Sequence, residues 1–173
     1  MNKKLDKVFR KAESEREKVL HLIRDIPADK LLVNPRKGKW SISQILSHII
    51  EVERISLAYM KKKSLGIAAA RDSGIWEDFK FLVLLISQRL PLKYKRPRII
   101  SGHDPASLTF PQIIQAWNAV RADLKDFLLT FDDRTIKRTI YKHAFSGRLN
   151  VVHAVKFFAE HLKHHLPQIK RLL

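Results

Sequence analysis

The sequence predicts an all-α protein, a four-helix bundle with one long crossover connection. Apolar residues recur at steps of three and four positions in four long stretches, which is the pattern of helices with one buried face. Strand and helix patterns do not alternate, and the five glycines form no phosphate-binding loop, which argues against a dinucleotide-binding α/β fold. The 173 residues, 45% of them hydrophobic, suffice for one core, so we expect a single domain over residues 1–173.

The first two helices are expected before residue 64. The first ends where Pro27 stands, because proline does not continue a helix. The second begins at a hydroxyl cap, Ser41 or Ser43, and runs to about Lys63. Its apolar stripe includes His48. The apolar positions of the two helices are Leu5, Phe9, Ala12, Val19, Ile23 and Ile26, then Ile42, Ile45, Leu46, Ile49, Val52 and Ile55.

The third and fourth helices are expected in the second half of the chain. The third follows the proline punctuation at Pro105 and Pro111, and the fourth starts near Asn150. Their apolar positions are Ile113, Ile114, Trp117, Val120, Leu124, Phe127 and Leu128, then Val151, Val155, Phe158, Leu162, Ile169 and Leu172.

Two connections carry structure of their own. The stretch from Gly66 to Ser101 is too long for an ordinary loop, so we expect it to cross the bundle and to contain a short helix near Trp76–Leu90. The topology is therefore not simple up-and-down. A second stretch, Asp132–Arg148, mixes β-branched residues with turn formers and predicts a short extended piece.

The chain is strongly basic, with 34 Lys and Arg against 17 Asp and Glu and a formal charge of +17. Such a field attracts phosphates, anionic lipids and acidic ligands. The charges are spread over all segments, with local clusters at Lys61–Lys63 and Lys93–Arg98, and no nucleic-acid recognition motif accompanies them. Binding to nucleic acid or to a membrane surface is therefore the less favoured alternative.

The location of the protein is inferred from what the chain lacks. Without cysteine it has no disulfides and no thiolate ligands, which fits a reducing compartment. The longest apolar run, Phe81–Ile86, is far below the roughly 20 residues that cross a bilayer. The first residues alternate charges and lack the apolar core of a secretory signal. We expect a cytoplasmic protein with no transmembrane segment.

Three histidines form the candidate site. His161 and His165 are four residues apart and share one helix face, and His48 lies more than a hundred residues upstream in an equally apolar pattern. Three neutral imidazoles with an open fourth position are typical of a catalytic zinc site. A single histidine in an apolar stripe is more often a hydrogen-bonded core residue, so this prediction depends on all three meeting.

The remaining histidines are interpreted as surface residues. His164 points about 100° away from its neighbour around the helix, which predicts an exposed cation. His21, His103 and His153 have no partner in the sequence pattern.

Two segments carry a resemblance to a known family. Residues 38–49, GKWSISQILSHI, resemble the second-helix signature of the DinB-like (DinB/YfiT) family, and residues 158–169, FAEHLKHHLPQI, resemble its last-helix motif. Residues 143–149, HAFSGRL, are similar to the family's entry into that helix. The resemblance implies a four-helix bundle, often dimeric, that holds a divalent metal on three histidines. By position these are His48, His161 and His165.

The sequence departs from the family pattern in two places. Pro167 lies inside the last helix, where its ring crowds a carbonyl, and a kink at the turn bearing His165 is expected. Ala144 and Ser146 replace residues common in the family's loop, so His143 is left out of the metal set.

Polar neighbours of the three histidines are candidates for supporting roles. Gln44 lies four residues before His48 and Glu51 lies three after it. We expect either side chain to contact a ligand histidine or a metal-bound water, or else to face solvent at the helix end. Gln168 is three beyond His165, whereas Glu160 faces away from His161. Glu51 is the candidate catalytic proton acceptor.

These features predict a divalent-metal-dependent enzyme of the hydrolase or thiol-dependent transferase type, the two activities that the resemblance implies. Zinc or nickel is the expected ion, since imidazole suits both. The expected substrate is a small molecule, anionic or thiol-containing, and the expected assembly is a homodimer. The alternative is a noncatalytic bundle that binds a metal or a small ligand.

Overall fold

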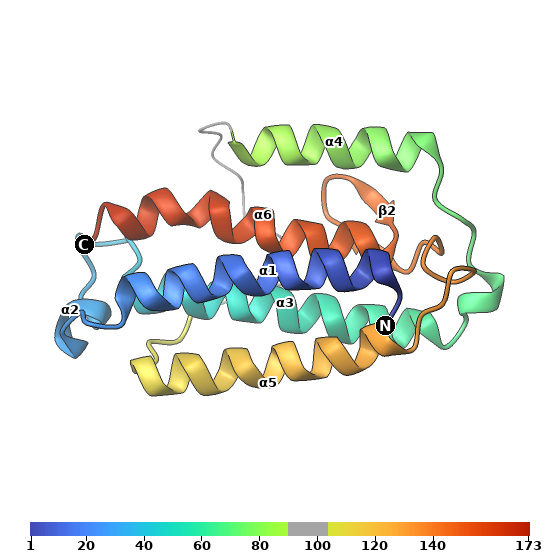
Figure 1. The fold of residues 1–173 in the computed structure, drawn as a ribbon. Coiled ribbons are helices and arrows are strands. Elements are labelled where there is room, and N and C mark those ends of the chain that lie inside the picture. Colours follow the sequence, from blue (N-terminus) through green and yellow to red (C-terminus); the bar gives the residue numbers. More distant parts are fainter. Residues whose placement is uncertain (90–103) are drawn as a thin grey trace.

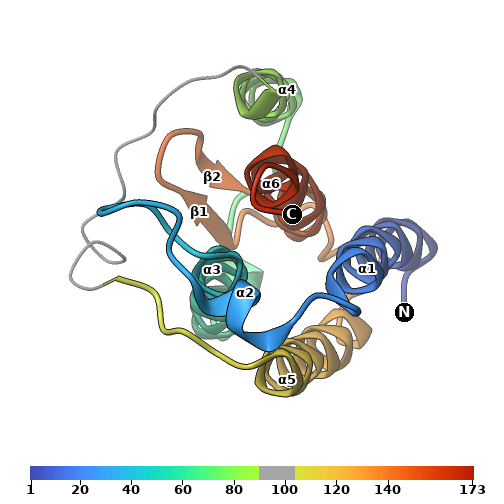
Figure 2. The ribbon, with the colours of Figure 1, turned by 90° about the vertical axis from the view of Figure 1, so that its left-hand side faces the viewer.

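The computed structural model describes residues 1–89 and 104–173 and is a four-helix bundle, as predicted (Figure 1). Two of the bundle helices, α1 and α6, run in one direction and the other two, α3 and α5, run in the opposite direction. Viewed along the bundle, α1 and α3 lie at opposite corners, and each packs against both α5 and α6 (Figure 2). The helices α3 and α5 follow one another in the bundle and are parallel, so the chain between them has to return along the length of the bundle. The bundle helices are α1 (Lys3–Ile23), α3 (Ile42–Ser64), α5 (Phe110–Leu129) and α6 (Val151–Lys170).

Polar side chains cap the start of three of the bundle helices, two of them at the predicted places, Ser41 and Asn150. Asn2 begins α1 and Asn150 begins α6, and each side-chain oxygen accepts a backbone N–H of the first turn at 2.9 Å. Ser41 begins α3 in a capping box with Gln44, whose Oε1 accepts the Ser41 N–H at 3.1 Å. Each such cap contributes on the order of 1 kcal/mol.

Shorter elements lie in the connections. Helix α4 (Ile75–Arg89) confirms the predicted extra helix and lies outside the bundle, against α6 (Figures 1 and 2). Helix α2 (Ala28–Leu32) and the 3-10 turn η1 (Ile67–Ala69) were not predicted, because both are too short to show a periodic pattern. Residues 90–101 of the predicted crossover, with the basic cluster Lys93–Arg98, lie outside the described residues, as does His103.

The predicted extended piece is a β-hairpin, in which β1 (Tyr141–His143) pairs antiparallel with β2 (Gly147–Leu149). Gly147 closes the turn with φ +69°, a conformation that glycine adopts without steric cost. Strand β1 packs against α3 and β2 against α4. The hairpin therefore joins α4 to the side of the bundle.

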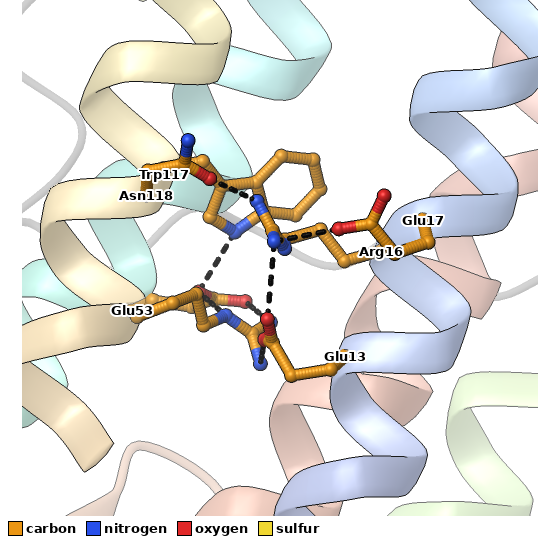
Figure 3. A network of polar contacts seen from close by, with 7 residues as sticks. Glu13, Arg16, Glu17, Glu53, Trp117 and Asn118 are labelled. Carbon is orange, nitrogen blue, oxygen red and sulfur yellow. Dashed lines mark hydrogen bonds and ion pairs between the residues drawn. The ribbon is translucent and has the colours of Figure 1, made fainter.

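The interior contains a charged network as well as apolar residues. Glu53 of α3 is 1% exposed, and its carboxylate accepts hydrogen bonds from the Arg121 guanidinium at 2.6 and 2.9 Å and from Trp117 Nε1 at 3.0 Å. Burial raises the pKa of Glu53, while Arg121 acts in the opposite direction. Figure 3 shows how Glu13 and Arg16 of α1 extend this network. The network ties α1, α3 and α5 together.

Among the described residues, none of the helices combines the length and the apolar character that a membrane span requires.

Candidate metal centre

Helices α3 and α6 bring the three predicted histidines together. His48 projects from the first half of α3, and His161 and His165 project from the second half of α6. One ring nitrogen of each lies within 4.8 Å of the others. The ring centroids are 5.3 Å apart for His48 and His161, 5.2 Å for His48 and His165, and 4.7 Å for the two residues of α6. These three side chains are called the histidine cluster below.

Hydrogen bonding orients the His165 ring. Its Nδ1 lies 2.9 Å from Oε1 of Gln168, and an amide oxygen only accepts, so Nδ1 carries the proton. The Nε2 of His165 therefore presents a lone pair, and it lies 3.1 Å from Nε2 of His161. Two imidazole nitrogens thus converge on one point, which is the arrangement of ligands that share an ion.

The cluster favours neutral imidazoles. His161 and His165 are both buried. Burial, followed by the neighbouring histidines, holds the pKa of His161 well below its ordinary value. Burial likewise lowers the pKa of His165 to about 3, although its bond to Gln168 acts in the opposite direction. The neutral ring is the form that binds a metal ion, so no proton has to be displaced near pH 7.

The approach of the two Nε2 atoms tests whether these residues fit an ion. They lie 3.1 Å apart, and a cation between the rings would engage the Nε2 lone pairs of His161 and His165 together. Nδ1 of His161 then carries the ring proton, and this buried atom has no acceptor among the described residues. The donor set of three imidazoles suits zinc or nickel.

Aromatic side chains enclose the cluster. The Phe157 ring stacks on His161 with centroids 5.3 Å apart and an interplanar angle of 14°, and Trp40 lies 5.1 Å from His48. His48 is only partly buried, so the cluster is enclosed at α6 and more accessible at α3. We did not identify these aromatic residues from the sequence, although the four-residue spacing from Phe157 to His161 is a usable signal.

His143 contacts Phe157 but is not part of the histidine cluster. Its ring centroid is 4.6 Å from that of Phe157, and its Nδ1 accepts the backbone N–H groups of Phe145 and Ser146 at 3.3 and 3.4 Å. Burial lowers the pKa of His143 to about 4. Within residues 1–89 and 104–173, the group of converging ligand atoms does not include His143.

Three of the four polar candidates, Glu51, Gln44 and Glu160, bind partners outside the histidine cluster. The Glu51 carboxylate accepts a hydrogen bond from Arg54 Nε at 2.9 Å and is partly exposed. Gln44 caps its own helix. Glu160 binds Arg89 of α4 through two guanidinium hydrogen bonds, at 2.6 and 3.1 Å. Of the polar neighbours considered from the sequence, Gln168 is the one whose described contacts include the histidine cluster.

Two surface predictions are wrong. His153 is 5% exposed, lies 2.9 Å from Asp78 through Nε2 and stacks on Phe81. His164 is half-buried, and its Nδ1 lies 2.8 Å from the carbonyl oxygen of Gln88. In both cases α4 covers a face of α6 that would otherwise meet solvent.

Helix α6 continues through Pro167, and the expected kink at the turn bearing His165 stays a prediction. Helix α6 continues from Val151 to Lys170, and the contact between His165 and Gln168 spans the proline. Pro167 lies in the last turn, so the backbone N–H that it lacks affects only the end of the helix.

The fold and the histidine cluster define a class of protein, the four-helix bundles with a crossover whose second and last helices bring histidines together. The chain belongs to the DinB superfamily, whose family model matches residues 11–169. No curated protein matches the chain.

Two solved structures share the fold. One is TT2238, a four-helix bundle protein, with a TM-score of 0.60 and 18% identity over 96% of this chain and 98% of that one. The other is YfiT from Bacillus subtilis, described as a probable metal-dependent hydrolase with an unusual four-helix bundle topology. Its TM-score is 0.60 and its identity 15%, over 97% of this chain and 85% of that one.

Proposed function

We propose that this protein is a divalent-metal-dependent enzyme, of the hydrolase or thiol-dependent transferase type, with His48, His161 and His165 as metal ligands. The observation that carries the proposal is the convergence of three imidazole rings from two helices, with ligand atoms within 4.8 Å of one another. The description of YfiT as a probable metal-dependent hydrolase supports the hydrolase type. The proposed ion is zinc or nickel.

The ion, when bound, supplies Lewis acidity toward a water molecule or a substrate oxygen. The chain supplies orientation and enclosure. Gln168 holds His165 in the tautomer that leaves Nε2 free to coordinate. Phe157 restricts the His161 ring and keeps water from its face. The partly exposed side at His48 is the proposed route for the substrate.

Glu51 is the proposed proton acceptor. It is one helical turn beyond His48 on α3, and its carboxylate accepts a hydrogen bond from Arg54. Glu51 has to release Arg54 before it can take a proton from the substrate or from water. Once a substrate is known, Glu51→Gln should abolish turnover and Arg54→Ala should retain it. Unchanged turnover in Glu51→Gln would remove this assignment.

The proposed substrate is a small molecule that carries an anionic or thiol group. The formal charge of +17 draws anions toward the protein by a long-range field. Homodimer formation and a cytoplasmic location belong to the same proposal. Association that is equally fast at low and high salt would argue against electrostatic guidance.

Metal analysis tests the ligand set. Protein purified without a histidine tag should carry one equivalent of zinc or nickel by mass spectrometry of the elements. His161→Ala should lose the ion, and so should His48→Ala. The exposed His21→Ala is the matched control and should retain it. A wild-type protein that binds neither ion, or a His161→Ala variant with the wild-type content, would overturn the proposal.

A further inference from the structure

Helix α4 presents a largely apolar outer face. Its inward positions Glu77, Phe81, Leu84 and Gln88 are buried. Its outward positions are exposed by 50 to 89%. These outward residues, called the apolar face of α4 below, are Ile75, Trp76, Phe79, Leu82, Val83 and Ile86. A helix face that is apolar over several turns is normally covered.

The apolar face is large for a protein surface. Six side chains, two of them aromatic, are at least half exposed along about three helical turns. Together they expose on the order of 600 Å², at the upper end of the largest apolar patches on monomeric proteins. Figure 2 shows α4 at the edge of the molecule, with its inner side on α6 and the hairpin and its outer side turned away from the bundle. The arrangement indicates a docking surface.

The two acidic residues of α4 both have partners, but only Glu77 is buried. Glu77 accepts hydrogen bonds from Arg71 at 2.7 Å and from the Gly74 N–H at 2.9 Å. Asp78 lies 2.9 Å from Nε2 of His153, and its side chain stays 69% exposed one turn before Leu82. The six residues of the apolar face include no acidic side chain, so Asp78 is an exposed carboxylate at its border and is outnumbered by the cations described next.

Basic side chains lie on and beside α4. Lys80 lies over the Trp76 ring of the apolar face at 5.3 Å, and Lys156 of α6 lies over Phe81, on the inner side of α4, at 6.0 Å. Burial lowers the pKa of Lys156, the charges of Lys4 and Lys11 on α1 lower it further, and that of Asp78 raises it, so these cations lie near one another beside α4. The ends of α4 add two more cations, since Arg71 and Arg89 keep 57 and 65% of their side chains exposed despite their ion pairs.

We propose that the apolar face of α4 docks on an anionic lipid bilayer, with the helix lying in the plane of the interface. Tryptophan, phenylalanine and aliphatic side chains enter the boundary between headgroups and acyl chains, and the surrounding lysines contact anionic headgroups. A second copy fits the charges less well, because its apolar face is bordered by the same cations and each chain carries +17. Among the described helices none is suited to span a bilayer, so the contact is peripheral.

Vesicle cosedimentation tests this proposal on the full chain. The protein should bind vesicles that contain phosphatidylserine, should bind pure phosphatidylcholine vesicles weakly, and should dissociate as salt is raised. The triple variant Phe79→Ser, Leu82→Ser, Val83→Ser should lose at least about tenfold in partitioning. Its control replaces three similarly exposed residues elsewhere, Val33→Ser, Leu65→Ser and Leu129→Ser, and should bind like the wild type.

Charge reversal provides a second variant that leaves α4 untouched. The double variant Lys4→Glu, Lys11→Glu should lower binding to anionic vesicles by about fivefold or more for each position. The triple variant should keep the metal content of the wild type, so this proposal and the metal proposal fail separately.

Three results would overturn the bilayer proposal. One is the absence of binding to anionic vesicles, and another is equal binding by the triple variant. The third is a wild-type dimer, seen by sedimentation equilibrium, that the triple variant dissociates. That last result would assign the apolar face to a second copy of the chain.

Discussion

His165 and Gln168 are joined across Pro167, with Nδ1 of His165 2.9 Å from Oε1 of Gln168. The two residues are one helical turn apart on α6, so the helix itself provides this contact. An amide that fixes the tautomer of a ligand histidine raises metal affinity without touching the ion. Removing it should therefore weaken binding and leave the fold intact.

We expect Gln168→Ala to lower the affinity for zinc or nickel by about 10- to 100-fold. The measurement is a competition titration against a chelator of known affinity. Gln168→Glu keeps an acceptor oxygen and is the matched control, which should bind at least as tightly as the wild type. An affinity in Gln168→Ala equal to that of the wild type would show that Gln168 does not orient the His165 ring.

We expect Pro167→Ala to stabilise the metal-free protein by about 1 kcal/mol or more, because it restores an N–H that can donate to the carbonyl of Lys163. Part of the gain is offset because alanine leaves the unfolded chain freer than proline does. Urea denaturation of both proteins measures the difference in the free energy of unfolding. A lower midpoint for the variant would mean that the proline is accommodated better than its position in α6 suggests.

The ion pair between Glu53 and Arg121 should be costly to break from one side. Glu53→Ala leaves the Arg121 guanidinium buried without its main partner and should destabilise the protein by about 3–5 kcal/mol. Replacing both residues, Glu53→Met with Arg121→Met, removes both charges and should cost less than Glu53→Ala alone. Chemical denaturation provides the comparison. A double variant less stable than either single variant would contradict this account of the network.

His143 should make the stability of the metal-free protein depend on pH. Its pKa falls from 6.5 to about 4 on folding because of burial, so between these values the unfolded chain binds a proton that the folded chain does not. Its contribution is complete above about pH 6.5 and is lost as the pH falls toward 4, by about 3 kcal/mol in total.

The check is the free energy of unfolding at several pH values for the wild type and for His143→Asn, whose side chain does not titrate there. The wild type should lose more stability than the variant between pH 6.5 and 4. If the free energy of unfolding changed equally with pH in both proteins, the pKa of His143 would be the same in the folded and unfolded states.

The bundle helices and the shared face of His161 and His165 were predictable because both depend on local spacing. His161 and His165 share a face by helix geometry alone, and His48 lies on an apolar stripe that has to face the core. Local spacing does not show that the helix face bearing His48 packs against the face bearing His161 and His165. The resemblance of residues 38–49 and 158–169 to one family supplied that link.

The misassigned residues have a common physical origin. His153 and His164 lie on parts of α6 that a four-helix bundle would leave in solvent, but α4 covers them as a fifth helix. The apolar periodicity of α6 does not show that a further helix packs on its outer side. Glu53 and Arg121 were missed for a related reason, because a charge in a helical pattern is normally solvated unless a distant partner pairs with it.

The pairing of α3 with α6 makes the histidine cluster a late product of biosynthesis. More than a hundred residues separate His48 from His161 and His165. A nascent chain on the ribosome exposes the first ring long before the other two have been translated. Any ion that needs all three rings would be acquired only after α6 has emerged, so ribosome-stalled chains ending before residue 151 should take up none.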